Sequence, residues 1–383
     1  MEDIKPIEAI RAVREGRMSR RDFTKLLTAA GVGMATMPLI PTVGKAATED
    51  HPLVFTWAGY EEEGFNAAYR EKHDGELPNF SFFGDEEEAF AKIRAGFKAD
   101  VSMPCSYKIP QWTKAGVIQP IDTSRLSNWK DIIPNLKNIE GTVIDGNQMF
   151  VCQDWAQTSI LYRTDLMKEL AGDIEESWGM MWDERLAGRI SMLDSLIDGV
   201  MVAAIYGGAK NPFNMDDADI EMTRELLRQQ LPLLRFYSND TTSIEQALAS
   251  GELVAAVAWT ASYGNLKAEG IPVTWAQPKE GAMTWTCGLC LQADADEAKL
   301  DRSYDFIDAM LSPEAGEYEI MEWYYGHSNL KAFERVSKED LEARGYPSDP
   351  NKFGEFLSAG IFQEPILNEP VLQEMFEEVK AGM

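Results

Sequence analysis

The pattern of apolar and polar positions predicts alternating short strands and helices over most of the chain. Residues 52–57 and 80–83 are compact apolar and aromatic runs typical of strands, and residues 100–103 are apolar enough for a buried parallel strand. Residues 62–71 and 86–97 separate these strands and carry apolar side chains at helical spacing. This strand–helix–strand–helix–strand order predicts an open, mostly parallel sheet with helices on both faces.

A second unit of the same kind is predicted later in the chain. Residues 189–193 and 253–259 are predicted strands, and residues 196–206, 217–232 and 242–250 are predicted helices. No repeat or low-complexity linker separates the two units. We therefore expect an α/β fold with two hinged lobes and a ligand cleft at the carboxyl ends of the strands. Further strands are predicted at 149–151, 273–275 and 283–291, and further helices at 106–115, 298–311 and 370–380.

The N-terminal segment 1–46 has the order of features found in an export signal. The adjacent Arg20 and Arg21 precede an apolar run, 26–34, that is too short to span a bilayer comfortably. Small residues at 43–46 then match the positions that a signal peptidase reads. We therefore predict a twin-arginine signal peptide that is cleaved after residue 46, and a periplasmic location for the mature chain. The alternative is an N-terminal amphipathic helix of a cytoplasmic protein.

Length and charge narrow the possible partners. Removal of the predicted signal leaves 337 residues, which is enough for two lobes with separate cores. The signal carries eight basic and five acidic residues, so its removal changes the formal net charge from −27 to −30. A chain this negative is not expected to bind nucleic acid or anionic membranes, and it favours cationic ligands in a general way. No later segment has the length and apolarity of a membrane-spanning helix, so no membrane insertion is expected.

The few cysteines and histidines do not indicate a disulfide scaffold, a redox centre or a metal site. Cys287 and Cys290 form a C-x-x-C pattern, but they fall in a predicted strand, where residues three apart face opposite sides. We therefore expect no metal and no cofactor. The other cysteines are Cys105 and Cys152, and the histidines, which lack the spacing of metal ligands, are His51, His73 and His327.

Motifs of catalysis are missing from the sequence. There is no glycine-rich phosphate loop, no G-x-S-x-G turn and no H-E-x-x-H helix. Acidic runs at 61–63 and 85–88 could suggest paired catalytic carboxylates, but acids at the start of a helix are favoured by the helix dipole. We therefore expect no catalytic residues, and an exported enzyme is kept only as a remote alternative.

Aromatic residues recur at or just beyond the ends of the predicted strands. Rings that converge on one cleft would attract an alkylammonium group through their quadrupoles, by about 0.5–2 kcal/mol each. The simpler interpretation of any one of these residues is core packing. Their shared position at strand ends favours a ligand cleft for the set. Most of the set lies there, namely Trp57, Tyr60, Tyr107, Trp155 and Trp259, whereas Trp285 begins a predicted strand and Tyr325 lies in a loop after a predicted helical segment.

Several segments resemble one protein family in the same order along the chain. Phe55-Thr56-Trp57-Ala58-Gly59-Tyr60 and the segments 84–93 and 100–107 are similar to the first strands and ligand loops of periplasmic spermidine/putrescine-binding proteins of ABC transporters. The resemblance covers nearly the whole mature chain. It continues through 115–122, 256–259, 278–285 and 325–330.

The resemblance implies a two-lobed periplasmic binding fold of type II, with a mostly parallel sheet flanked by helices in each lobe and the ligand cleft between them. It places one lobe at 47–157 plus 286–333 and the other at 158–285 plus 334–383. It also implies no catalysis, a small cationic amine as ligand, and a membrane permease with its ATPase as partners. A hinge-closing carrier has no need to self-associate, so we expect a monomer.

The resemblance further implies a set of ligand-binding residues. The acids of the family carry over incompletely, because Cys287 stands where the family has a carboxylate. In our alignment Ser195 stands at a second acidic position and Asp198 at a third, whereas a shift of one residue would make Asp194 the ligand. The aromatic box carries over to Trp57, Tyr60, Tyr107, Trp259, Trp285 and Tyr325.

The missing carboxylates bear on the identity of the ligand. A buried ammonium group without a carboxylate partner costs several kcal/mol in desolvation, which aromatic rings offset best for weakly hydrated quaternary amines. A polyamine is the leading prediction, and a quaternary ammonium, a monoamine or a zwitterion is the alternative. A further alternative is a binding protein for another class of solute, such as a metal chelate, a phosphonate or a sugar. For an anionic ligand, Arg163 is the one arginine near a predicted strand end that we consider.

Overall fold

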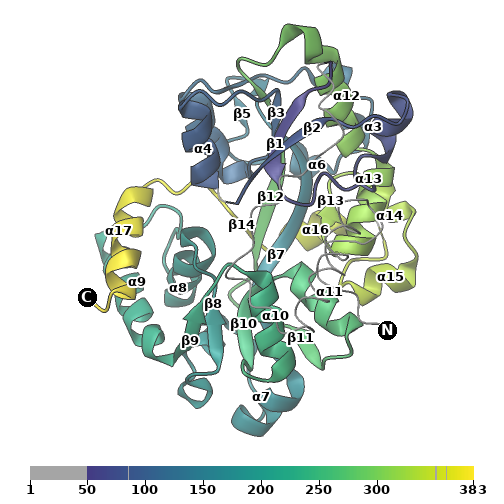
Figure 1. Cartoon of the computed structure of the whole chain (residues 1–383). Helices are drawn as coiled ribbons and strands as arrows, with labels where there is room; N and C mark the ends of the chain where they lie inside the picture. Colours follow the sequence, from purple (N-terminus) through teal and green to yellow (C-terminus); the bar gives the residue numbers. More distant parts are fainter. Residues whose placement is uncertain (1–49, 85, 350–351, 359) are drawn as a thin grey trace, which may run out of the picture. The chain divides into compact units, whose positions relative to one another are not determined.

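The computed structural model describes residues 50–84, 86–349, 352–358 and 360–383, and Figure 1 shows their arrangement. The predicted signal peptide and its cleavage site lie outside the described residues. Residues 50–383 form one compact unit. Within the described ranges, no helix combines the length and the apolarity that crossing a lipid bilayer would require.

The first sheet begins with three parallel strands, as predicted. β1 (Leu53–Trp57) lies between β2 (Asn79–Phe83) and β3 (Val101–Ser102) and is parallel to both. The helix α4 (Glu86–Arg94) follows β2, with its acidic residues in the first turn. The helix predicted at 62–71 is shorter than expected, because α3 (Ala67–Lys72) forms only its second half.

The second sheet has the predicted parallel core. β8 (Ile190–Met192) lies between β9 (Leu234–Tyr237) and β10 (Ala255–Trp259) and is parallel to both. Helices α8 (Met201–Gly207) and α9 (Asp217–Gln230) follow β8 and pack against each other. This part of the fold therefore repeats the order strand, helix, strand that the sequence predicts.

Two long antiparallel strands join the two sheets. β7 (Val151–Arg163) and β12 (Met283–Gln292) pair from Thr158 with Met283 to Val151 with Leu289. One end of β12 then pairs with β3, and the far end of β7 pairs with β10, so both strands run from one sheet into the other (Figure 1). The sequence predicted a strand only at 149–151 here. Trp155 was expected beyond that strand but lies inside β7, because the strand continues for 13 residues.

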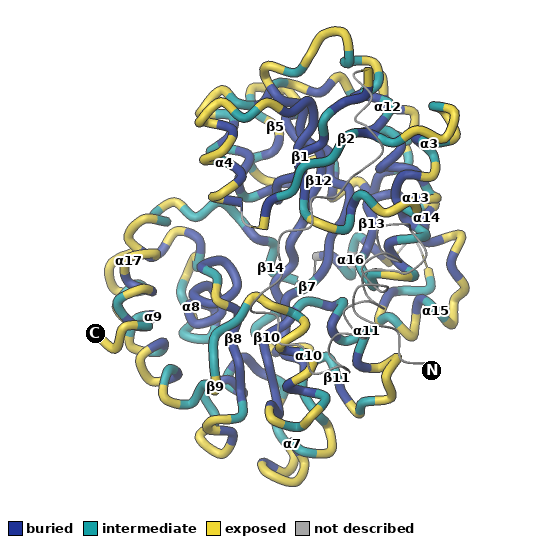
Figure 2. Tube along the Cα trace, in the orientation of Figure 1, coloured by how far each residue is buried: buried dark blue, intermediate teal, exposed yellow. Residues whose placement is uncertain are grey.

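The fold contains two main hydrophobic cores, in agreement with the α/β, two-lobed prediction. Val54, Phe55 and Phe306 belong to the first core, and Ile190 and Val257 belong to the second. Figure 2 shows the strands largely buried and the outer turns of the helices exposed.

The packing of the C-terminal part bears on the predicted lobe boundaries. Val336, Tyr346 and Phe353 pack in the first core, whereas Leu372 and Phe376 pack in the second. The segment 334–383, which the sequence places wholly in the second lobe, is therefore divided between the cores. The predicted lobe boundaries remain a proposal.

The remaining elements cover the sheets or extend them. The helices are α5 (Ile109–Lys114), α6 (Pro134–Lys137), α7 (Thr164–Ala171), α10 (Thr241–Ser250), α11 (Thr260–Ala268), α12 (Leu300–Met310), α13 (Pro313–Tyr318), α14 (Leu330–Glu334), α15 (Lys338–Ala343), α16 (Phe353–Ser358) and α17 (Glu369–Lys380). The strands are β4 (Ile118–Gln119), β5 (Val143–Ile144), β6 (Asn147–Gln148), β11 (Val273–Trp275), β13 (Gly326–His327) and β14 (Ile361–Phe362).

Candidate functional site

A small cluster of rings lies on the crossing strands, apart from the two main cores. The ring of Trp285 meets that of Tyr325 edge to face, with the ring centroids 4.8 Å apart. Tyr107 and Trp259 pack against the same cluster, which also contains Ala156 and a pair of cysteines. Four of the six aromatic residues predicted for the ligand box are therefore brought together. We call Tyr107, Trp259, Trp285 and Tyr325 the aromatic cluster.

The crossing strands bring these residues together through their register. Trp285 and Cys287 alternate along β12, so both point to the same face of the sheet. On β7, Ala156 is paired with Trp285 and Asp154 is paired with Cys287, so these two residues face the same side. Trp259 ends β10, which pairs with β7 at Thr158. One face of the crossing strands thus carries the cluster.

A disulfide bond links the cluster to the loop after β3. Cys105 is bonded to Cys287 across a sequence separation of 182 residues. The sequence analysis considered no pairing between these two cysteines, so the structure adds this bond. Cys290 lies in the first core instead, in agreement with the prediction that residues three apart on this strand face opposite sides.

Asp198 is the buried carboxylate beside the aromatic cluster. Its oxygens accept hydrogen bonds from Thr158 Oγ1 at 2.8 Å and from Gln363 Nε2 at 3.2 Å. The side chains of Ser195 and Trp259 also hydrogen bond to it. Burial raises the pKa of Asp198, and the hydrogen bonds from Thr158, Ser195 and Trp259 oppose this shift because they favour the charged form.

Ser195 and Asp194, the two alternative ligand positions that precede Asp198, differ in their surroundings. Ser195 caps the short helical turn η7 (Leu196–Val200), where its Oγ accepts a hydrogen bond from the backbone N–H of Asp198 at 3.0 Å. Asp194 is exposed and accepts a hydrogen bond from Lys380 Nζ at 2.8 Å. Ser195 therefore belongs to the hydrogen-bond group of Asp198, and Asp194 lies outside it.

Trp57 and Tyr60 lie toward the first core rather than in the aromatic cluster. The indole of Trp57 donates a hydrogen bond to the carbonyl of Met103 at 3.1 Å, and its ring packs against Phe83. Tyr60 is buried, and its hydroxyl donates a hydrogen bond to Asp154. Neither residue is therefore part of the aromatic cluster, although the sequence predicted both as members.

Trp323 connects Tyr60 to the aromatic cluster. Its ring lies 5.1 Å from that of Tyr60 and 5.9 Å from that of Tyr325, measured between centroids. The close approach of this indole requires glycine at position 59, where a Cβ atom would lie 2.5 Å from Trp323 and the backbone has a φ of +111°. Tyr60 therefore contributes to the cluster indirectly.

Two fully buried carboxyl groups lie next to this chain of rings. Asp154 and Glu319 hydrogen bond to each other, and both residues have 0% of their surface exposed. Burial raises the pKa of Asp154 to about 6, although the hydrogen bond from Tyr60 favours its charged form. Burial also raises the pKa of Glu319 well above its usual value, and the charge of Asp154 adds to the effect. A hydrogen bond between two carboxyl groups requires a proton, so the pair shares one.

A cavity of about 630 Å³ lies beside Tyr107, and seven of its 17 lining residues are charged. The Lys108 ammonium on its wall is bound by Glu87 and by Glu369, the latter at 2.7 Å. Glu86 also borders the cavity and hydrogen bonds to the hydroxyl of Tyr107. Acids outnumber lysines in the lining, so the cavity favours cations. The charged lining residues are Glu86, Glu87, Asp194, Glu369, Glu377, Lys108 and Lys380, and the predicted Ser195 also lines it.

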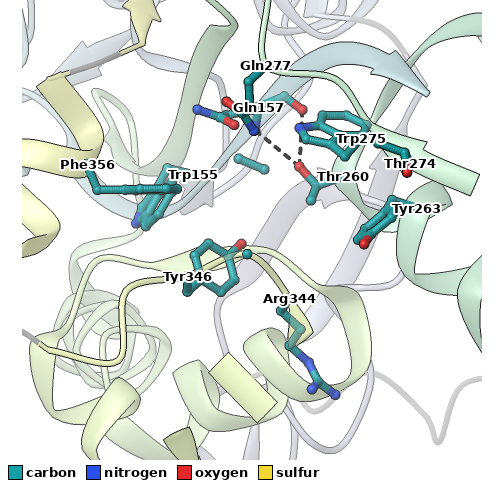
Figure 3. A pocket seen from close by; sticks show the side chains of 12 residues that line it. Trp155, Gln157, Thr260, Tyr263, Thr274, Trp275, Gln277, Arg344, Tyr346 and Phe356 are labelled. Carbon is teal, nitrogen blue, oxygen red and sulfur yellow. Dashed lines mark hydrogen bonds between the residues drawn. The ribbon is translucent and has the colours of Figure 1, made fainter. Parts of the chain in front are cut away.

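A smaller cavity of about 180 Å³ is lined by Trp155, Ala156 and Gln157 of β7 (Figure 3). Trp155 and Gln157 alternate with Asp154 and Ala156 along the strand. Figure 3 shows Arg344 pointing away from the cavity, where its guanidinium binds the carbonyls of η10 (Glu319–Trp323). This cavity contains none of the ten predicted site residues.

Arg163 and Trp155 are both engaged away from the aromatic cluster. The guanidinium of Arg163 binds Asp165 at 2.7 Å and the carbonyl of Leu248 at 2.8 Å. The indole of Trp155 donates to the carbonyl of His327 at 3.1 Å. The arrangement therefore gives no support to Arg163 as the partner of an anionic ligand.

Sequence reasoning missed several polar residues of this region. Asp154 lies in a strand that the sequence did not predict, and Glu319 lies in a helical segment where acids are common. Glu86 was interpreted as a solvated acid at a helix start. Side chains alternate between the two faces of β7, so Asp154 could have been assigned to the face of Trp285 if the pairing of β7 with β12 had been known. No local pattern marks Glu319. Trp323 and Gln363 were missed for the same reason.

Comparisons with known proteins agree with one another. Residues 66–343 match the family of bacterial extracellular solute-binding proteins. The putrescine-binding periplasmic protein PotF of Escherichia coli is 28% identical over 323 residues, which cover 80% of this chain and 86% of that protein. The spermidine/putrescine-binding periplasmic protein 1 of Haemophilus influenzae is 25% identical over 307 residues, which cover 79% of this chain and 82% of that protein.

Solved structures show the same fold. The spermidine/putrescine ABC transporter substrate-binding protein PotD of Streptococcus pneumoniae matches with a TM-score of 0.70 at 18% sequence identity. The match covers 86% of this chain and 98% of that chain. At this identity the likeness establishes the architecture alone.

Proposed function

The chain belongs to the family of bacterial extracellular solute-binding proteins, and we propose that it captures a polyamine of the putrescine or spermidine type. Members of this family and the curated relatives are substrate-binding proteins of ABC transporters, not enzymes. The ligand of this chain is proposed from the names of the relatives together with the chemistry of the site.

The observation that carries the proposal is the aromatic cluster beside a buried acid. Trp259 belongs to the ring cluster and also hydrogen bonds to Asp198. Rings attract an alkylammonium group through their faces, and a carboxylate anchors its N–H donors. The 630 Å³ cavity with its excess of acids supports a cationic ligand, because it raises the local concentration of cations.

The proposed mechanism is capture by closure of the lobes. The crossing strands β7 and β12 pair with each other and run from one sheet into the other, so bending there would open and close the cleft. The closed, liganded form would be recognised by a permease and its ATPase. We propose that the chain is exported by the twin-arginine pathway, acts in the periplasm and is a monomer.

A second candidate is a quaternary ammonium, a monoamine or a zwitterion. The observation that favours it is the disulfide at Cys287. This residue stands two positions after Trp285, where the family has a carboxylate, so this chain has no acid there. A diamine held at both ends would lack one of the expected acids. A ligand with a single cationic group would need only Asp198.

Calorimetric titration of the mature chain, residues 47–383, with putrescine, spermidine, agmatine, choline and glycine betaine tests both candidates. Putrescine or spermidine binding more tightly than choline and betaine supports the polyamine. The reverse order supports the second candidate. A flat response to every amine would contradict the ligand class, and turnover of any of them would contradict the assignment as a non-enzyme.

A further inference from the structure

The carboxyl pair of Asp154 and Glu319 has more hydrogen-bond acceptors than donors around it. Apart from the proton that the two carboxyls share, no described donor gives Asp154 Oδ1 or either carboxyl oxygen of Glu319 a hydrogen bond of ordinary geometry. The amide of Gln153 lies beside Glu319, and neither of its polar atoms makes a hydrogen bond of ordinary geometry. Gln153 is also fully buried. Buried polar atoms are nearly always satisfied, and one shared proton cannot satisfy all of these acceptors, so the group indicates a missing donor.

The pair lies where the site lacks its expected acid. Asp154 is the cross-strand partner of Cys287, so the two side chains start from neighbouring positions on one face. The register of β7 and β12 shifts just beyond this pair, between Cys287 and Gly288, which leaves Gln153 as the extra residue of a β-bulge. Bulges commonly re-aim side chains beside functional sites. The carboxylate absent from β12 is thus present on the next strand.

We propose that Asp154 and Glu319 hold one ammonium group of the ligand, in place of a carboxylate at position 287. This inference rests on the proposed function, which it deepens by naming the acids for the second end of the amine. A primary ammonium has three N–H donors, which match the orphan acceptors of Asp154, Glu319 and Gln153. Asp198 would hold the other cationic end, across the aromatic cluster.

The charge of the pair suits this role. With one shared proton the pair carries a single negative charge, which matches a single ammonium. A bound cation also lowers the pKa of Asp154, which is about 6 in the empty protein, so binding near pH 6.5 releases the second proton that Asp154 partly holds, while the shared proton stays on the pair. Both groups are buried, so the ammonium reaches them when the cleft opens.

The groups around the pair do not supply a competing cation. Burial raises the pKa of Tyr346, and the guanidinium of the nearby Arg344 partly offsets this rise. That guanidinium binds the backbone carbonyls of Ile320 and Met321 and the carboxylate of Asp340 rather than the pair. Four neighbouring groups have raised pKa values. Burial is the largest cause, and the negative charge of the carboxyls is the next largest. These neighbours are Tyr60, Cys152, Tyr325 and Tyr346.

The test uses Asp154→Asn and Glu319→Gln, with Asp305→Asn as the matched control. Asp305 binds Lys72 and His73, outside the carboxyl pair and the aromatic cluster, so its replacement removes the same charge away from the site. Putrescine binding is measured by calorimetry in two buffers of different ionisation enthalpy, near pH 6.5. We expect the wild type and Asp305→Asn to release protons, and each site variant to bind at least about tenfold more weakly with little release.

The outcomes separate this inference from the proposed function. If the wild type binds no amine, both are overturned. If it binds putrescine but Asp154→Asn and Glu319→Gln bind equally well, with the same proton release, only the carboxyl pair is overturned. If neither variant folds, the comparison is made between the wild type and Asp198→Asn. Proton release that persists in Asp198→Asn supports the pair, and its loss in that variant, or its absence in both proteins, overturns it.

Discussion

The hydroxyl of Tyr60 donates a hydrogen bond to Oδ2 of Asp154, 94 positions further along the chain. This contact joins an aromatic residue that the sequence indicated to a carboxylate that it did not. Since the hydrogen bond favours the charged form of Asp154, the hydroxyl helps to set the pH at which this acid can receive a cation.

Replacement of Tyr60 by Phe should therefore shift the pH dependence of binding. Without the hydroxyl, the pKa of Asp154 rises further, and binding of putrescine should weaken at a higher pH than in the wild type. Loss of the buried hydrogen bond should also lower the free energy of unfolding by about 1–3 kcal/mol at neutral pH. Calorimetric titrations from about pH 5 to pH 8 measure the shift.

The matched control is Tyr237→Phe, because the hydroxyl of Tyr237 has no hydrogen-bond partner among the described residues. This variant should keep both the pH profile and the stability of the wild type. An unchanged profile for Tyr60→Phe would show that its hydroxyl does not act on the binding carboxylate.

The empty protein should lose stability as the pH rises through the range in which Asp154 ionises. The folded-state pKa of Asp154 is raised to about 6, whereas an unfolded aspartate titrates near 4. Between these two pH values the folded state therefore binds more protons than the unfolded state. The free energy of unfolding should fall by about 2–3 kcal/mol between pH 4 and neutral pH. Urea unfolding of the wild type and of Asp154→Asn at about pH 5 and pH 7.5 isolates this contribution. Equal pH dependence in both proteins would contradict it.

The disulfide between Cys105 and Cys287 should stabilise the chain substantially. It closes a loop with a sequence separation of 182 residues, and removal of such a cross-link typically costs about 2–5 kcal/mol. The double variant Cys105→Ser/Cys287→Ser should melt at a lower temperature than the wild type, and a reductant should lower only the wild-type melting temperature. Cys152→Ser, which replaces a buried free thiol, is the control for reductant sensitivity. A wild-type melting temperature that is insensitive to reductant would indicate that the bond is not formed.

Truncation of Trp285 should weaken ligand binding more than truncation of an aromatic residue outside the cluster. Loss of one ring face from an ammonium site is expected to cost about 1–2 kcal/mol, or roughly tenfold in affinity. Trp182→Ala is the control, because this indole stacks on Tyr206 at 4.6 Å and lies at the edge of the second core. Dissociation constants for putrescine measured by calorimetry decide the comparison. Equal losses in the two variants would argue for a general packing effect.

Lys108 acts as an internal cation on the wall of the acidic cavity. Its ammonium lies between Glu87 and Glu369, and these acids outweigh the effect of burial, so the pKa of Lys108 is raised. Lys108→Gln should leave these acids available to the ligand. At low ionic strength we expect putrescine to bind this variant several-fold more tightly than the wild type. The gain should disappear near 0.5 M salt, because the Debye length then falls to a few ångströms.

Lys331→Gln is the matched control for this charge effect. Lys331 binds Asp131 at 2.8 Å and does not line the cavity. Its replacement removes the same charge, so it should leave the affinity nearly unchanged. A similar gain in both variants would indicate that net charge, rather than the cavity, controls binding.

Much of the fold could be predicted from local pattern. β1, β2 and β10 are short, largely apolar runs, and the helices α9 and α10 show clear helical spacing and begin at the aspartate caps Asp216 and Asp240. Side-chain period depends only on neighbouring residues, so these elements are visible without any tertiary information. The positions of Trp259 and Trp285 near strand termini follow from the same pattern, whereas their place in one cluster was expected from the family resemblance.

The long strand β7 was missed because it is buried on both faces. It therefore lacks the alternation that marks a half-buried strand, and polar residues such as Gln153 and Asp154 interrupt its apolar run. With β7 unplaced, Trp155 was assigned to a loop, and the partner of Cys287 could not be identified. The disulfide to Cys105 was likewise hidden, because a bond between distant cysteines leaves no local trace.

The sequence by itself determined the α/β class, most of the short strands and helices, and which aromatic residues stand at strand ends, because these depend on spacing along a few turns of chain. Only the tertiary structure decided that Asp154 meets Glu319, a residue 165 positions away, and that Tyr60 turns toward this pair instead of joining the rings. Such contacts arise from the register of β7 against β12 and from the packing of distant segments on them. Residue order alone does not encode that geometry in any local pattern.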